Sequence, residues 1–298
     1  VVWSVLHPGM SVAVNPPHPA QLEERYDLID ELRTFSRACG NGDPVVLVHG
    51  AGVSSTYWQP ALRHLAESGF RACAPDLPGF GRSQDPPWRP SFRLLTDHLT
   101  HWIEQVVGAP VHLVGQSVGC ELAVMTAVEA PWLVRSLVLA APAGLPCLHS
   151  VTRQLLLALL DAPREPVCLY PAILPDYLRC GIPRFLHLLW EQRRPRVDLL
   201  LPKVRQPALV LRGCADQVVS AARTAAVADL LPHARLTAIP GAHGAHYTHA
   251  AEFTKAVREF LLQVDSPAPP ADNRGDNTAL APLATGPIGA GSLPPPGG

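Results

Sequence analysis

The chain has 298 residues, 47% hydrophobic and 16% charged, which fits a well-buried globular domain and excludes a fibrous or fully disordered protein. Its 24 basic and 25 acidic side chains give a formal net charge of −1, so no large field of either sign favours nucleic acid or an anionic membrane surface. The expected partner is therefore a small-molecule substrate, and the composition says nothing of the oligomeric state.

The chain also lacks the patterns of export and membrane insertion. No basic stretch followed by a long apolar run opens it, and no window holds the roughly 18 consecutive apolar residues of a membrane span. Its 7 cysteines are scattered, without a CxxC pair or a metal-ligand spacing. These observations predict a cytoplasmic protein without a metal site.

Both ends of the chain have a composition that disfavours packing. Residues 1–20 carry several prolines and are expected to form a flexible N-terminal segment. Residues 265–298 are rich in Pro, Gly and Ala and show no apolar period, so they cannot bury enough surface to offset their ordering entropy. We expect a disordered tail there and a folded core at 21–144 and 205–264.

Short β-branched runs alternate with longer amphipathic ones in this core, a pattern typical of βα units around a mostly parallel sheet, which is an α/β fold. Tyr26–Ala38 indicates an antiparallel hairpin at the edge. The other expected strands are Val45–Val48, Arg71–Ala74, Val111–Val114, Ser136–Ala140, Ala208–Arg212 and Arg235–Ile239. The expected helices are Tyr57–Ser68, Phe92–Val107, Ser117–Glu129, Ala221–Leu231 and Ala250–Leu262.

Residues 145–204 interrupt this alternation. They contain helical apolar periods such as VTRQLLLALLDA and IPRFLHLLWEQRR and no convincing strand. A structureless loop of that length is improbable in a compact domain, so we predict a helical lid over the sheet. Its leucines, with Trp190 and Phe185, predict an apolar substrate pocket, and Trp190 is a candidate substrate contact.

The segment Gly115-Gln116-Ser117-Val118-Gly119 has the pattern G-x-S-x-G between an expected strand and an expected helix. Glycines on both sides of the serine allow a sharp turn that lifts the hydroxyl to a helix N-terminus, where backbone N–H groups favour an oxyanion. The structural alternative is a plain glycine-rich turn with a helix-capping serine. In this context the pattern favours Ser117 as a nucleophile.

A serine hydroxyl needs a base to accept its proton and a third group to orient that base. Asp216 and His243 each follow the end of an expected strand, so both reach the carboxyl edge of the sheet, where open α/β folds place their sites. We predict Asp216 as the orienting acid and His243 as the base. His246 is the alternative base. Rival carboxylates are Asp76, in a loop that an aspartate commonly organises, and Asp161 and Asp198 in the lid.

Together these segments make the chain resemble the α/β-hydrolase superfamily over about residues 22–263. Besides the serine turn, the matching blocks are VVLVHGAG (Val45–Gly52), APDLPGFGRS (Ala74–Ser83), LRGCADQVV and PGAHGAHYTHAAEF (Pro240–Phe253). The resemblance implies an oxyanion hole from the backbone N–H groups of Ala51 and Val118. It also implies a packing role for His49 and a place beside the pocket for His246, a second candidate substrate contact.

The reaction implied is hydrolysis of a small, largely apolar ester through an acyl-enzyme, without metal or organic cofactor. Four alternatives stay open: a carbon–carbon hydrolase of vinylogous diketones, an acyltransferase, a cofactor-free peroxidase-like enzyme and a non-catalytic binding protein. Carbon–carbon hydrolases of this superfamily often carry Ser-Met-Gly-Gly, where this chain has Ser117-Val118-Gly119-Cys120, so that match is partial.

Overall fold

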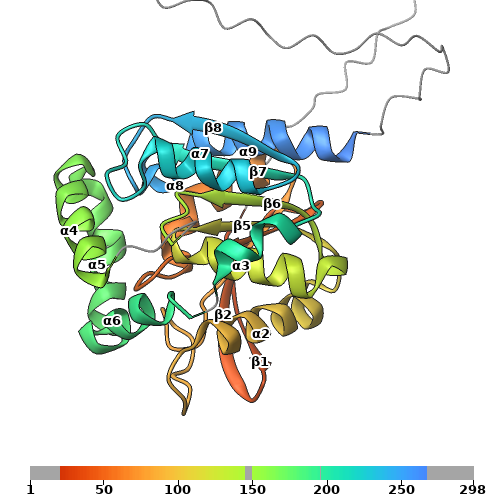
Figure 1. Cartoon of the computed structure of the whole chain (residues 1–298). Coiled ribbons are helices and arrows are strands. Elements are labelled where there is room, and N and C mark those ends of the chain that lie inside the picture. The colour runs from red at the N-terminus through yellow and green to blue at the C-terminus, as the bar shows by residue number, and fades with distance from the viewer. Residues whose placement is uncertain (1–20, 145–149, 195, 267–298) are drawn as a thin grey trace, which may run out of the picture. The chain divides into compact units, whose positions relative to one another are not determined.

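The computed structural model describes residues 21–144, 150–194 and 196–266 (Figure 1). Its strands are β1 (Glu23–Ile29), β2 (Leu32–Cys39), β3 (Pro44–Val48), β4 (Arg71–Pro75), β5 (Val111–Gln116), β6 (Val134–Ala140), β7 (Ala208–Gly213) and β8 (Ala234–Ile239). They form one sheet in the order β1-β2-β4-β3-β5-β6-β7-β8. The pairs β1–β2 and β2–β4 are antiparallel, and all the other neighbouring pairs are parallel. The mostly parallel sheet and its edge hairpin are thus confirmed.

Helices cover both faces of this sheet. One face packs against α1 (Gln59–Glu67) and α9 (Ala250–Asp265), and the other against α2 (Phe92–Trp102), α3 (Val118–Glu129) and α7 (Ala221–Leu230). Alternate residues of one strand serve the two layers: Val45 and Leu47 of β3 face α1 and α9, whereas Val46 and Val48 face α2 and α3. Burial on both faces explains the continuous apolar runs of the central strands.

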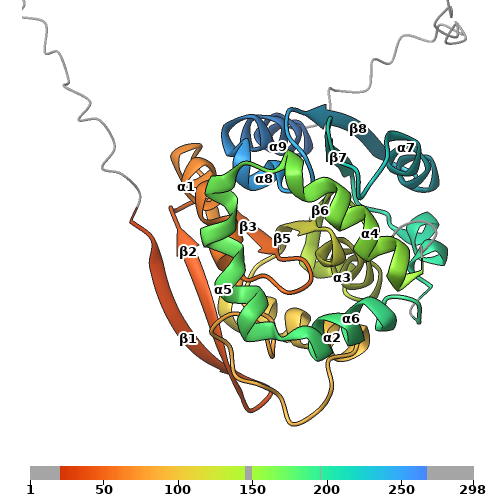
Figure 2. The same cartoon turned by 90° about the vertical axis from the view of Figure 1, so that its left-hand side faces the viewer.

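A third group of helices follows β6. We call residues 150–194 the cap segment; it contains α4 (Val151–Asp161), α5 (Tyr170–Cys180) and α6 (Ile182–Glu191). Within its described residues it holds helices and turns but no strand, as its periodicity indicates. Figure 2 shows the three helices lying across the carboxyl ends of the central strands. The loops after β5, β7 and β8 therefore open toward the cap segment.

The predicted flexible ends, 1–20 and 267–298, lie outside the described residues. The expected tail begins one residue too early, because Asp265 still belongs to α9. Its carboxylate pairs with Arg135 at 2.5 Å and lies 3.3 Å from His112, which holds the helix end against the sheet. In the described part of the chain, no helix is long and apolar enough to cross a membrane.

Candidate active site

Ser117 sits on a strained turn between β5 and α3. Its backbone angles are φ 52° and ψ −117°, in a region that costs a residue with a side chain about 1–3 kcal/mol. The turn is held by hydrogen bonds from the Ser117 N–H to the Ala140 carbonyl (3.0 Å) and from the Cys120 N–H to the Ser117 carbonyl (3.1 Å). The strain therefore persists and keeps the serine at the carboxyl edge of the sheet.

The glycines of this turn are required by close backbone approach. A Cβ on Gly115 would collide with the backbone of Gly119 and come within 2.6 Å of the Cys120 nitrogen. A Cβ on Gly119 would meet the backbone of Val48 and lie 2.8 Å from the His49 carbonyl oxygen. Backbone atoms cannot rotate away as a side chain can, so the packing of α3 against β3 excludes any larger residue at these positions.

The structure brings His243 and Asp216 together. His243 Nδ1 lies 3.1 Å from Asp216 Oδ2, and Asp216 Oδ1 accepts the backbone N–H groups of Val218 and Val219, both at 2.8 Å. Asp216 is thus a buried carboxylate, one oxygen of which binds backbone N–H groups while the other faces His243. An Nδ1–H donated to Asp216 leaves Nε2 of the imidazole free to accept a proton.

Burial lowers the pKa of His243, but the charge of Asp216 and its hydrogen bond, with further help from Asp161 and Glu165, outweigh burial and raise the pKa above 6.5. A histidine with a raised pKa is a stronger base for the proton of a serine hydroxyl. Ser117 and His243 line the same cavity, although among the described residues their side chains are not hydrogen-bonded to each other. Such bonds often tighten only when substrate binds.

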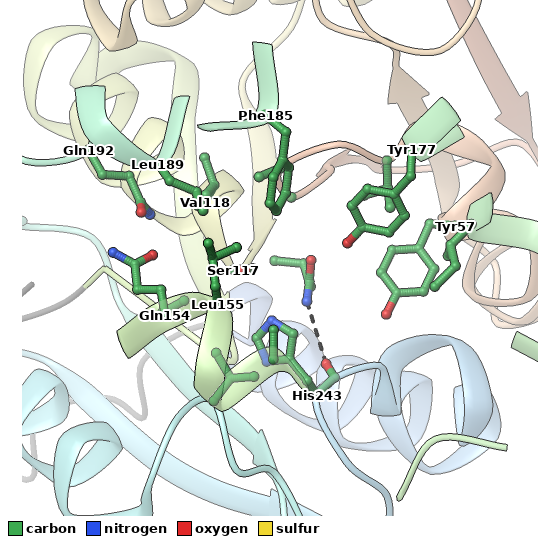
Figure 3. A pocket seen from close by; sticks show the side chains of 18 residues that line it. Tyr57, Ser117, Val118, Gln154, Leu155, Tyr177, Phe185, Leu189, Gln192 and His243 are labelled. Atoms are coloured by element: carbon green, nitrogen blue, oxygen red, sulfur yellow. Dashed lines mark hydrogen bonds between the residues drawn. The ribbon is translucent and has the colours of Figure 1, made fainter. Parts of the chain in front are cut away.

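The cavity between the sheet edge and the cap segment has a volume of about 110 Å³. Figure 3 shows Ser117 at its centre, with Tyr57 and Tyr177 on one side and Gln154 and Gln192 on the other. Apolar side chains fill most of the remaining wall: Val53, Leu155, Ile173, Phe185, Leu189 and Val218. A volume this small favours a short substrate over a long lipid chain.

The two residues expected to form an oxyanion hole, Ala51 and Val118, both line this cavity. Val118 is the first residue of α3, so its N–H is one of the free donors at a helix start. Gln116 connects the neighbouring loops: its Nε2 donates to the His243 carbonyl at 3.5 Å, and its Oε1 occupies space beside Gly50. The oxyanion loop and the histidine loop are therefore packed against one side chain.

Two carboxylates of the cap segment reach the catalytic loops, and sequence reasoning missed their position. Asp161, at the end of α4, is 3% exposed. Its Oδ1 accepts the Gln217 N–H at 2.8 Å and its Oδ2 accepts the His243 N–H at 3.2 Å. Glu165 accepts the N–H of Gly244. The cap segment thus binds the backbone of both loops that carry Asp216 and His243.

We expect Asp161→Asn to move the acidic limb of the kcat/KM profile to lower pH. His243 acts as a base when neutral, so activity appears as pH rises through its pKa, and loss of the Asp161 charge lowers that pKa. The value of kcat/KM at the optimum should fall about tenfold, because one backbone N–H loses its charged acceptor. Profiles measured on one ester test this.

Asp198→Asn is the matched control for that experiment, since Asp198 also lies near the cap segment but pairs with Arg196 at the surface. Its profile should coincide with that of the wild type. An acidic limb left in place by Asp161→Asn would show that Asp161 has no electrostatic influence on the base.

The structure places two expected substrate contacts outside the cavity. His246 is 2% exposed and packs among Tyr57, Trp58 and Phe253, and burial lowers its pKa well below 6.5. Trp190 is 46% exposed and stacks on His187. Leu189 faces the cavity, and the next residue of a helix points about 100° away, so Trp190 turns toward solvent. Both expectations are therefore corrected.

The rival residues have structural partners elsewhere. Asp76 accepts the N–H groups of Ser55 and Arg82, both at 2.7 Å, and so organises its loop as expected. His49 accepts the Leu77 N–H at 3.1 Å on Nε2, while its Nδ1 lies 2.9 Å from the Gly50 carbonyl oxygen. Burial lowers the pKa of His49, which fits a neutral side chain with a packing role.

A sheet of this order, with a serine on a strained turn after β5 and an aspartate and a histidine after β7 and β8, defines an α/β hydrolase. A family model described as the alpha/beta hydrolase fold matches residues 43–164. The putative carbamate hydrolase RutD of Variovorax paradoxus is 31% identical over 258 residues, which cover 78% of this chain and 96% of that protein. The chain belongs to the α/β-hydrolase family and is a hydrolase.

Other relatives are consistent with this assignment. The 2-hydroxymuconate semialdehyde hydrolase of a Pseudomonas species is 26% identical over 264 residues, covering 80% of this chain and 93% of that protein. The crystal structure of CarC, a serine hydrolase involved in carbazole degradation, superposes with a TM-score of 0.68 at 25% identity, covering 82% of this chain and 100% of the other. The similar proteins are thus hydrolases that are named for different substrates.

Proposed function

We propose that the protein is a serine hydrolase of small esters or related carbonyl compounds, with Ser117 as nucleophile, His243 as base and Asp216 as the acid that orients the base. The observation that carries this proposal is the His243–Asp216 hydrogen bond beside a serine on a strained turn in one cavity. A protein that only bound its ligand would have no use for a nucleophile held in a costly conformation.

The chemistry follows from these positions. Ser117 Oγ attacks the carbonyl carbon while His243 Nε2 takes its proton, and the backbone N–H groups of Ala51 and Val118 stabilise the oxyanion. His243 then gives the proton to the leaving alcohol, and an acyl-enzyme remains. Water, deprotonated by the same histidine, releases the acid and restores Ser117. His243 passes the proton taken from that water to Ser117 Oγ, so one water molecule is divided between the alcohol and the acid, and the cycle needs no metal or organic cofactor.

The cap segment supports a small apolar substrate and acts, in this proposal, as the lid of the cavity. Leu155 of α4, Ile173 of α5 and Phe185 of α6 all line the cavity, so each cap helix contributes an apolar side chain. Exclusion of water strengthens the electrostatic interactions that catalysis uses. We also propose that the protein acts in the cytoplasm, as its sequence predicts.

Reaction with a fluorophosphonate probe tests the proposal directly. The purified protein should be labelled on the peptide that contains Ser117 and should hydrolyse p-nitrophenyl acetate and butyrate, and labelling should abolish that hydrolysis. Labelling elsewhere, or none in a folded protein, would refute the serine mechanism. A protein that is labelled but cleaves vinylogous diketones faster than esters would instead be a carbon–carbon hydrolase.

A further inference from the structure

A buried amide closes one side of the cavity. Gln192, at the end of α6, is 2% exposed and lines the cavity. Its Oε1 is buried and has no hydrogen-bond partner among the described residues. Buried polar atoms in folded proteins are almost always hydrogen-bonded, so an acceptor of this kind beside a nucleophile indicates a place for a donor that the substrate supplies.

Glu121 fixes which way this amide turns. It lies on α3, is 1% exposed, and has its Oε1 and Oε2 3.0 and 2.9 Å from Gln192 Nε2. When ionised, above its raised pKa of about 8, Glu121 only accepts hydrogen bonds, so it must then face the amide NH₂ group. Glu121 does not line the cavity, whereas Gln192 does. The amide oxygen is therefore the atom of Gln192 that remains available to bind a ligand.

The surroundings of Glu121 are shaped to hold its carboxyl group in one place. A Cβ on Gly144 would collide with Glu121 Oε1 and come within 3.0 Å of Gln192 Nε2, so only glycine leaves room for the pair. Burial raises the pKa of Glu121 to about 8, and the hydrogen bond from Gln192 and the charge of Arg223 on α7 oppose that rise. A buried acid that packs so tightly against one amide acts as its support.

Gln192 lies on the acyl side of the nucleophile. His243 must protonate the leaving group, so the leaving group is bound on the histidine side of Ser117. Figure 3 shows Gln192 beside Leu189 and Val118, across Ser117 from His243. A group that contacts Gln192 therefore belongs to the acyl half of the substrate.

We propose that Gln192, oriented by Glu121, accepts a hydrogen bond from an N–H or O–H group on the acyl part of the substrate and so determines specificity. The enzyme then prefers acyl groups with such a donor, as in carbamates and hydroxyacyl esters, over alkyl groups of the same shape. A site that offers a buried acceptor discriminates against a methyl group because the acceptor is left unpaired. The inference rests on the proposed function.

Three pairs of phenyl esters test it: acetate and carbamate, propionate and glycolate, butyrate and 3-hydroxypropanoate. In each pair a methyl group is replaced by NH₂ or OH, and the donor-to-alkyl ratio of kcat/KM is measured at pH 9 by chromatography of released phenol. In at least one pair this ratio should fall tenfold or more in Gln192→Leu. Dividing the wild-type ratio by the ratio of Gln192→Leu removes the difference in chemical reactivity between the two esters of a pair.

Two further variants keep the result interpretable. Glu121→Gln leaves Gln192 in place, but the new amide can bind either end of the Gln192 amide and so no longer fixes its orientation. The donor-to-alkyl ratio of kcat/KM should therefore fall toward the value of Gln192→Leu. Gln263→Leu, which replaces an exposed glutamine of α9, should leave the ratio unchanged.

The donor-to-alkyl ratio of the wild type should also rise as pH passes about 8, because below that pH a protonated Glu121 would donate to the amide oxygen of Gln192 and occupy it. In Glu121→Gln that pH dependence should vanish.

If the donor-to-alkyl ratio of kcat/KM is the same in the wild type and in Gln192→Leu for all three pairs, the inference is overturned. This holds also when both proteins hydrolyse the alkyl esters. That result would leave the proposed function intact. Failure of the wild type to hydrolyse any alkyl or donor-bearing ester, with no fluorophosphonate labelling, would instead overturn the proposed function and the inference together.

Discussion

Replacement of Ser117 by alanine is expected to lower kcat for p-nitrophenyl butyrate by about 10⁴- to 10⁶-fold, with little change in KM. The loss is large because the other two residues of the proposed triad have no nucleophile to activate, and what remains comes from the oxyanion hole and from binding. The folded structure should persist, since alanine keeps the Cβ that Ser117 already accommodates at φ 52°.

Kinetics of purified Ser117→Ala, with its thermal midpoint measured beside that of the wild type, check this expectation. Ser68→Ala is the matched control, because Ser68 follows the last residue of α1 and does not line the cavity. A Ser117→Ala protein with a tenth or more of the wild-type kcat would show that another residue carries the reaction.

Replacement of Asp216 by asparagine should lower kcat/KM about 10⁴-fold through the wrong histidine tautomer. The N–H groups of Val218 and Val219 both bind Oδ1, so the asparagine carbonyl would stay there and its NH₂ group would face His243. His243 Nδ1 would then have to accept, and the ring proton would move to Nε2, which could no longer take the proton of Ser117.

Loss of the Asp216 charge also lowers the pKa of His243, so the residual activity of Asp216→Asn should extend to lower pH than that of the wild type. A pH profile of kcat/KM distinguishes this from simple unfolding, which would not move the acidic limb. Asp229→Asn, at an exposed position of α7, is the control. A loss of less than tenfold would exclude Asp216 as the orienting acid.

The fold was predictable because its signals are local. Strands that are buried on both faces appear in the sequence as continuous apolar runs, and helices are recognised by the regular spacing of their apolar residues. The expected and observed elements therefore agree closely. The meeting of Asp216 and His243 was predictable too. Both follow parallel strands, and the carboxyl ends of such strands lie at one edge of a sheet.

The remaining features depend on packing that no local pattern encodes. Asp161 reaches His243 only because α4 crosses the sheet edge with its last turn above the loop after β8, and sequence spacing alone does not report that crossing. Trp190 was misplaced because a shift of one residue changes the face of a helix. Glu121 did leave a signal: it is the single acid near the start of the apolar run CELAVMTAVEA.

The hydrogen bonds that Asp161 and Glu165 accept couple the position of the cap segment to the pKa of His243. If the part of the cap segment that carries Asp161 and Glu165 moves away to admit substrate, the N–H groups of His243 and Gly244 lose their carboxylate acceptors, and two of the charges that raise the pKa of His243 are lost. An open molecule is then a poor catalyst. Under the proposed function, water that enters the open cavity before the substrate would meet a weaker base, and full activity would return once the cap segment closed over the acyl group.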